Sequence, residues 1–158
     1  MPSKVILKSK FFNHSVPAAQ ALQYTIERAL QAITWLRETE EERERKYNAG
    51  EDGYITGERS RILADIISVY TSTLVEKGGS GHSLLKSYVR NDFVKKFIAL
   101  PIVGKCIMNR HNRSAHEAKS YGYFVSPKEI LNSDLESWLN EAQFFLVIFP
   151  EKNKTNYA

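Results

Sequence analysis

The chain has 158 residues, 42% hydrophobic and 25% charged, a composition typical of one folded domain with a sizeable core. Its formal net charge is +4, and its single cysteine, Cys106, excludes both a disulfide framework and a zinc site built on paired cysteines. The longest apolar run, residues 144–149, is too short to span a membrane. A lone cysteine of the buried type fits a reducing compartment, so we expect a cytoplasmic protein.

The first predicted helix covers residues 17–48. Apolar residues recur in it at spacings of three and four, which is the pattern of a helix with one buried face. They are Leu22, Ile26, Ala29, Leu30, Ile33 and Leu36. The mixed-charge run 37–46 extends this helix into solvent, and residues 48–53 (NAGEDG) predict a turn.

A second helix is predicted over residues 56–76, ending at the glycine-rich link 77–81. Its apolar residues predict a broad buried face. They are Ile62, Leu63, Ile66, Ile67, Val69, Tyr70, Thr73 and Leu74. A third helix is predicted over residues 82–99, with Leu85, Tyr88, Val89, Phe93 and Phe97 turned inward. Pro101 ends it, because proline is favoured in the first turn of the next helix.

The fourth helix is predicted over residues 101–118, with Ile102, Val103, Cys106 and Ile107 on its core side. Residues 119–129 read as a loop. Ser133 followed by Glu136 has the spacing of a capping box, which predicts the start of a last helix that Pro150 ends. The sequence therefore predicts an all-α bundle of four long helices plus a short motif-bearing helix. It forms a single domain, 1–158, with short flexible tails at 1–14 and 151–158.

Positive charge is concentrated in one part of this bundle. Residues 82–119 hold eight of the 22 lysines and arginines but two of the 18 acidic residues. Within them lies the stretch NRHNRSAHEA, residues 109–118, directly after an apolar run. Such asymmetry predicts a polyanionic partner such as nucleic acid, and the alternative interpretation is a basic surface without a ligand.

Two chemistries are disfavoured for this stretch. Cys106, His111 and His116 are spaced five residues apart, so they step about 140° around a helix and do not converge on a metal. Cys106 lies on the apolar side of its helix, where burial raises a thiol pKa and suppresses its nucleophilicity. Glycine-rich phosphate loops, zinc-protease motifs and nucleophile elbows are also missing from the sequence. We therefore expect neither a metal nor a cofactor.

Arginine and histidine together can cleave RNA without a metal. An imidazole accepts the proton of a ribose 2′-hydroxyl near neutral pH, and a guanidinium binds the phosphate oxygens and stabilises the developing charge. The hydroxyl then attacks its neighbouring phosphorus. DNA lacks that hydroxyl, so this chemistry selects RNA without reading bases.

The stretch RHNRSAH, residues 110–116, resembles the R-x(4–6)-H motif of HEPN domains, helical-bundle ribonucleases of prokaryotic toxin–antitoxin and antiviral defence systems. His111 matches the polar residue that follows the arginine, and Ala115 matches the alanine before the histidine. As in that family, the motif precedes the last helix. The resemblance implies that Arg110 binds the phosphate, that His111 orients it or supports Arg110, and that His116 transfers the proton.

The same resemblance implies a homodimer whose two motifs share one cleft, and an antitoxin or defence-complex partner. Asn112 and Arg113 lie four and three residues before His116, on its face of a regular helix, so Arg113 is an alternative phosphate ligand. Asn112 and Arg113 are further expected to bind RNA, together with Lys105 and Lys119. Lys95 and Lys96 are weaker candidates for guiding the RNA.

Two other functions compete with the ribonuclease. One is a non-catalytic HEPN-like RNA-binding or regulatory module. The other is a dimerising helical interaction protein whose partner docks on the charged helix end, residues 39–45.

Overall fold

The computed structural model describes residues 17–75, 85–86, 89–111 and 125–148, and this part of the chain folds as helices without strands. The predicted all-α class is confirmed. In chain order the helices are α2 (Pro17–Asn48), α3 (Tyr54–Val75), α5 (Asn91–Ile98), α6 (Pro101–Asn109), α7 (Pro127–Leu131) and α8 (Leu135–Ile148). The two predicted tails, 1–14 and 151–158, lie outside the described residues.

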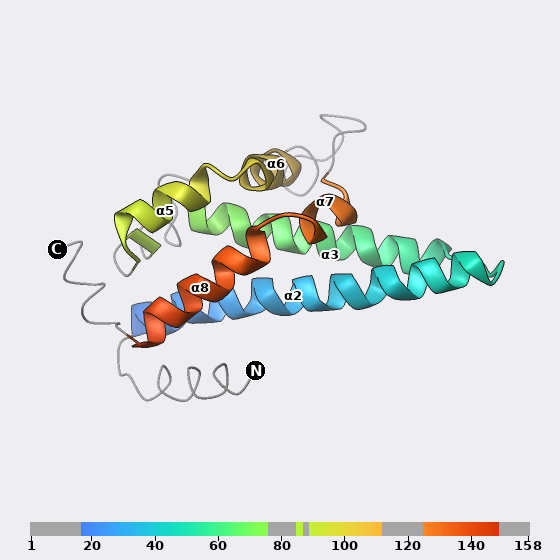
Figure 1. The fold of residues 1–158 in the computed structure, drawn as a ribbon, viewed down its shortest axis with the longest axis horizontal. Coiled ribbons are helices and arrows are strands. Elements are labelled where there is room, and N and C mark those ends of the chain that lie inside the picture. The colour runs from blue at the N-terminus through green and yellow to red at the C-terminus, as the bar shows by residue number, and fades with distance from the viewer. Residues whose placement is uncertain (1–16, 76–84, 87–88, 112–124, 149–158) are drawn as a thin grey trace.

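The two longest helices, α2 and α3, run antiparallel along the molecule, and the turn that joins them projects beyond the other helices (Figure 1). Gly50 ends α2 in a left-handed conformation, with φ of 72°. The N–H of Glu51 donates to the carbonyl of Lys46 at 2.8 Å, and the N–H of Gly50 donates to the carbonyl of Tyr47 at 3.1 Å. This pair of bonds is a Schellman motif, and it confirms the predicted turn at the predicted place.

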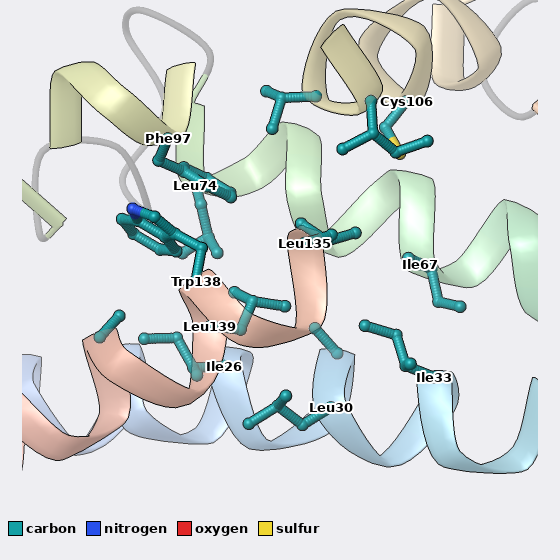
Figure 2. Packing of buried hydrophobic residues seen from close by; sticks show 14 of the residues in the cluster. Ile26, Leu30, Ile33, Ile67, Leu74, Phe97, Cys106, Leu135, Trp138 and Leu139 are labelled. Carbon is teal, nitrogen blue, oxygen red and sulfur yellow. The ribbon is translucent and has the colours of Figure 1, made fainter. Parts of the chain in front are cut away.

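The apolar core lies between α2, α3 and α8 and extends toward α5 and α6 (Figure 2). Ile26 and Leu30 of α2 meet Leu139 of α8, and all three are almost completely buried. Trp138 lies at the edge of the core next to α5. Its ring stacks on Phe97 with centroids 3.7 Å apart, and its Nε1 donates to the carbonyl of Phe93 at 3.0 Å. The indole thus packs its apolar body and pairs its one polar atom.

The predicted buried face of α3 is partly wrong. Ile62, Ile66 and Val69 are 57%, 38% and 37% exposed. The buried face carries small and polar residues instead, together with Ile67, Leu74 and Val75. The small and polar ones are Thr56, Ser60, Ala64, Ser68, Thr71 and Ser72. Apolar residues occur almost all around this helix, so periodicity alone did not define its inner side. Small side chains let α2 and α6 approach α3 more closely than branched ones would.

Two other expectations need correction. The predicted helix over residues 82–99 is interrupted: Arg90 is extended, with φ of −55° and ψ of 138°, and α5 begins after it. The predicted loop 119–129 contains the start of α7, where Ser126 and Glu129 form a complete capping box.

The capping box predicted at Ser133 and Glu136 does not form. Glu136 instead accepts from the guanidinium of Arg37 at 2.6 Å. The N–H of Ser133 donates to the carbonyl of Ile130, so it is not available to a carboxylate three residues later.

Within the described residues, no helix is both long enough and apolar enough to cross a membrane.

Candidate functional site

The motif-bearing segment begins at the end of α6, and the packing of this short helix on α3 decides where it lies. Pro101 occupies the first turn of α6, as predicted. The helix buries four residues at spacings of one, three and three, which form one face: Ile102, Val103, Cys106 and Asn109. The first three are apolar or behave as apolar, and the fourth is an amide. The last turn of α6 therefore meets α3 through a polar contact.

Asn109 is completely buried, and its side-chain amide bridges to two residues of α3. Its Nδ2 donates to Oδ1 of Asp65 and to Oγ of Ser68, both at 2.9 Å. Oγ of Ser68 in turn donates to the carbonyl of Ala64 at 2.8 Å. Because the hydroxyl hydrogen is directed to that carbonyl, the Ser68 oxygen presents its lone pairs to Asn109.

Arg110 and His111 follow this bridge directly. The N–H of Arg110 donates to the carbonyls of Cys106 and Ile107, and from here the helix continues in a wider, π-type turn that includes His111. Both side chains are half-buried. Wider turns of this kind occur mostly as single turns within α-helices and are frequent at functional sites. The structure thus places the Arg110 guanidinium and the His111 imidazole, both predicted site groups, in the π-type turn that follows α6.

The other members of the predicted site are His116, Asn112, Arg113 and Lys119, and they lie outside the described residues. Their distances to Arg110 and His111 therefore stay predictions, as does the choice between Arg110 and Arg113 as phosphate ligand.

Lys105, expected to bind RNA, is exposed one turn before Asn109 and pairs with Glu129 of α7 at 3.0 Å. The backbone N–H of Ser126 and then the Lys105 ammonium lower the pKa of the Glu129 carboxyl. This carboxylate offsets the charge of Lys105, so Lys105 adds less to a positive surface than the sequence implied. Lys95 and Lys96, on α5, are exposed.

Cys106 is fully buried between α6 and α3 (Figure 2). Burial raises the pKa of its thiol to about 11, and the nearby hydroxyls of Ser68 and Thr71 oppose this rise in part. A thiol with such a pKa is almost entirely protonated at neutral pH, so it is a poor nucleophile and a poor metal ligand. In the part of the chain that the structure describes, no three histidine, cysteine or acidic side chains gather as metal ligands.

The polar contact of Asn109 with Asp65 and Ser68 was not predicted from the sequence, although two signals for it exist. Asn109 occurs three residues after Cys106 and seven after Ile102, where the apolar face of α6 calls for another apolar residue. Small residues recur at spacings of three and four along α3, which marks the face that approaches a neighbouring helix closely. Together, the two patterns indicate that α6 packs against α3.

A second surface feature involves the charged end of α2. A groove of about 670 Å³ separates the charged end of α2 from α7, and Glu41, Glu44, Tyr47 and Lys128 are among its lining residues. It includes part of residues 39–45, the segment on which the interaction hypothesis placed a partner.

Comparison of the sequence with models of known protein families, with curated proteins and with solved structures found no match.

Proposed function

We propose that this chain is a metal-independent endoribonuclease whose active site is built around Arg110, His111 and His116. The observation that carries the proposal is the anchored end of α6. A buried amide holds the backbone directly before Arg110, while Arg110 and His111 themselves stay partly exposed. Catalytic groups held on a rigid support in this way are oriented before the substrate binds.

The reaction uses the ribose itself as the nucleophile. One imidazole, assigned to His116, removes the proton of the 2′-hydroxyl, and the resulting oxygen attacks the adjacent phosphorus. Arg110 binds the non-bridging oxygens and stabilises their negative charge as the bond to the 5′-oxygen breaks. A second imidazole donates a proton to that leaving oxygen. The products are a 2′,3′-cyclic phosphate and a free 5′-hydroxyl.

A homodimer accounts for the second imidazole, because two copies supply two motifs to one cleft. Mixing unmodified chains with an excess of His116→Ala chains tests this arrangement. If both motifs act in one cleft, each mixed dimer has one His116 imidazole in place of two and loses activity, so the rate falls more steeply than the fraction of unmodified chains. A rate that falls only in proportion to that fraction contradicts a composite site.

Cleavage of a fluorescent single-stranded RNA in excess chelator, with DNA of the same sequence as the control substrate, tests the chemistry. We expect RNA cleavage that persists in chelator and is lost in both Arg110→Ala and His116→Ala. Arg113→Ala, compared with Arg110→Ala, identifies the phosphate ligand. Arg59→Ala removes an exposed arginine of α3 and should leave the rate unchanged. An unmodified chain without RNA cleavage overturns the proposal.

The biological role that follows is a toxin or an antiviral effector, controlled by an antitoxin or a defence complex. This role derives from the HEPN resemblance of residues 110–116. It predicts that expression of the unmodified chain in bacteria arrests growth and that His116→Ala relieves the arrest.

The same protein variants and RNA substrate distinguish two alternative functions. A non-catalytic RNA-binding module binds RNA, with an affinity that falls as salt rises, but does not cleave it. An interaction protein shows no RNA affinity. The groove between α2 and α7 supports the interaction-protein alternative, because it offers a place where a partner could bind. Under that alternative, Glu44→Lys in the groove should weaken partner binding.

A further inference from the structure

We propose that Asn109 is a positioning residue: by holding α6 to Asp65 and Ser68 of α3, its side-chain amide fixes the directions of Arg110 and His111. The inference rests on the proposed function to the extent that it treats those two side chains as the working groups. The bridge itself is a feature of the fold and can be tested without any activity.

The first argument is the residue type. Asn109 occupies the last position of a buried face whose other members are Ile102, Val103 and Cys106. An apolar side chain there would contribute more burial energy and bring no polar group into the interior. Moreover, Oδ1 of Asn109 has no hydrogen-bond partner among the described residues, which lowers stability further. Stability alone therefore does not explain an amide at this position.

The second argument is geometric. Asp65 and Ser68 are three residues apart on α3, so they lie on neighbouring turns of one face. A donor group that reaches both acceptors at 2.9 Å fixes α6 against rotation about its axis and against sliding along α3. Apolar contacts do not impose such a restriction, and a single polar residue in an apolar helix interface is a known way to select one register.

The orientation of the amide is also determined. If the amide were turned over, Oδ1 would face the Asp65 carboxylate, and two acceptors would repel each other. The carboxylate accepts hydrogen bonds and cannot donate them while ionised, so the amino group of Asn109 has to point toward it. Asp65 thus determines the orientation of the Asn109 amide. Asn109 in turn fixes the orientation of the last turn of α6 relative to α3.

The third argument concerns α6 itself. It has nine residues, and no side chain caps its first turn. Helices this short have little intrinsic stability, so their orientation comes from their tertiary contacts. Arg110 and His111 are the next two residues along the chain, and a rotation of α6 changes the direction of both. A displacement of about 1 Å in an active site can reduce the rate by on the order of 10²-fold.

The decisive variant removes both groups of the Asp65–Asn109 hydrogen bond. The double variant Asp65→Ala, Asn109→Leu replaces both partners with apolar side chains, which is close to neutral for stability when shapes match. We expect little change in the melting temperature, a fall in kcat on the order of 10²-fold, and a nearly unchanged Kd for RNA. Unchanged kcat in a folded double variant overturns the proposal.

A swap provides a rescue test. Asn109→Asp alone sets two carboxylates against each other and should lower kcat. Adding Asp65→Asn restores a donor and an acceptor in the reverse order, so kcat should recover. The control Cys106→Ala removes packing one turn earlier on the same interface, and it should lower the melting temperature while leaving kcat unchanged. If Cys106→Ala lowers kcat as much as the bridge variants do, general loosening explains the effect and the proposal is wrong.

A readout that does not depend on catalysis separates this inference from the nuclease proposal. If the unmodified chain does not cleave RNA, the nuclease proposal fails, and the backbone amide NMR signals of Arg110 and His111 decide the positioning role. Those signals should shift more in Asp65→Ala, which removes an acceptor of Asn109 without changing a sequence neighbour of Arg110, than in Cys106→Ala. Signals that stay in place in folded Asp65→Ala overturn the positioning role.

Discussion

Two of the helix interfaces in this bundle differ in the contacts that hold their helices together. Between α2 and α8 the buried contacts are mainly aliphatic, and residues such as Ile26, Leu30 and Leu139 are almost completely buried. Two polar pairs, Arg37 with Glu136 and Glu27 with Gln143, also join these helices. Between α3 and α6 the contacts include hydroxyls, a thiol and the amide of Asn109. The first interface supplies stability through area removed from water. The second gives up part of that stability for a defined relative orientation, and the candidate site lies directly beyond it.

The largest loss of stability is expected from a substitution in the apolar core. Trp138→Ala should lower the free energy of unfolding by about 3–5 kcal/mol, because it removes a buried indole and leaves a cavity beside Phe97. Trp35→Ala is the matched control, since Trp35 is 50% exposed, and its effect should be much smaller. Chemical denaturation followed by far-UV circular dichroism measures both. Equal losses for the two tryptophans would contradict the assigned core.

A smaller effect should distinguish two buried serines of α3. Ser68→Ala removes an acceptor of Asn109 and a donor to the carbonyl of Ala64, so we expect a loss of about 1–2 kcal/mol. The hydroxyl of Ser72 is buried and has no hydrogen-bond partner within the described residues, so Ser72→Ala should be neutral or slightly stabilising. Thermal unfolding of the two variants tests the difference. Equal effects of the two substitutions would contradict the stabilising role assigned to the hydrogen bonds of Ser68.

The smallest effect concerns α7, which contacts both long helices. Ser126→Ala removes half of the capping box and should destabilise the fold by about 1 kcal/mol. The hydrogen bond from the Ser126 backbone and the Lys105 ammonium lower the pKa of Glu129 in the folded state. Its stabilising contribution is therefore complete above the unfolded pKa, about 4.3, and is lost as the pH falls below it.

Comparing the stability of the unmodified chain with that of Glu129→Gln from pH 7 to pH 3 checks the sign. The difference between them should shrink as the pH falls. A difference that grows on acidification would contradict the assigned pKa direction.

The sequence predicted those parts of the fold in which one pattern dominates. The limits of α2 follow from Pro17, an aliphatic stripe and the turn at Gly50, and all three signals agree. Arg90 carries no such signal, so the interruption before α5 was missed. The motif Ser126-Pro127-Lys128-Glu129 has both a capping-box spacing and a proline in the first turn, yet it lay in a stretch read as a loop.

The candidate site was only partly predictable for a related reason. Arg110 and His111 were chosen by residue type and motif spacing, which depend on local sequence. Their support by Asp65 and Ser68 depends on a contact between residues more than 40 positions apart, and the outer position of Ile62 and Ile66 concealed which side of α3 forms that contact. Long-range polar pairs of this kind leave no periodic pattern in one sequence.

The burial of Cys106 gives the chain an internal reporter. It is the sole thiol among 158 residues, and it lies at the interface of α6 with α3. An alkylating reagent reaches it only when those helices separate, so the labelling rate at neutral pH measures how often the interface opens. The opening rate of the α3–α6 interface, which adjoins the candidate site, can thus be measured by mass spectrometry without an added probe.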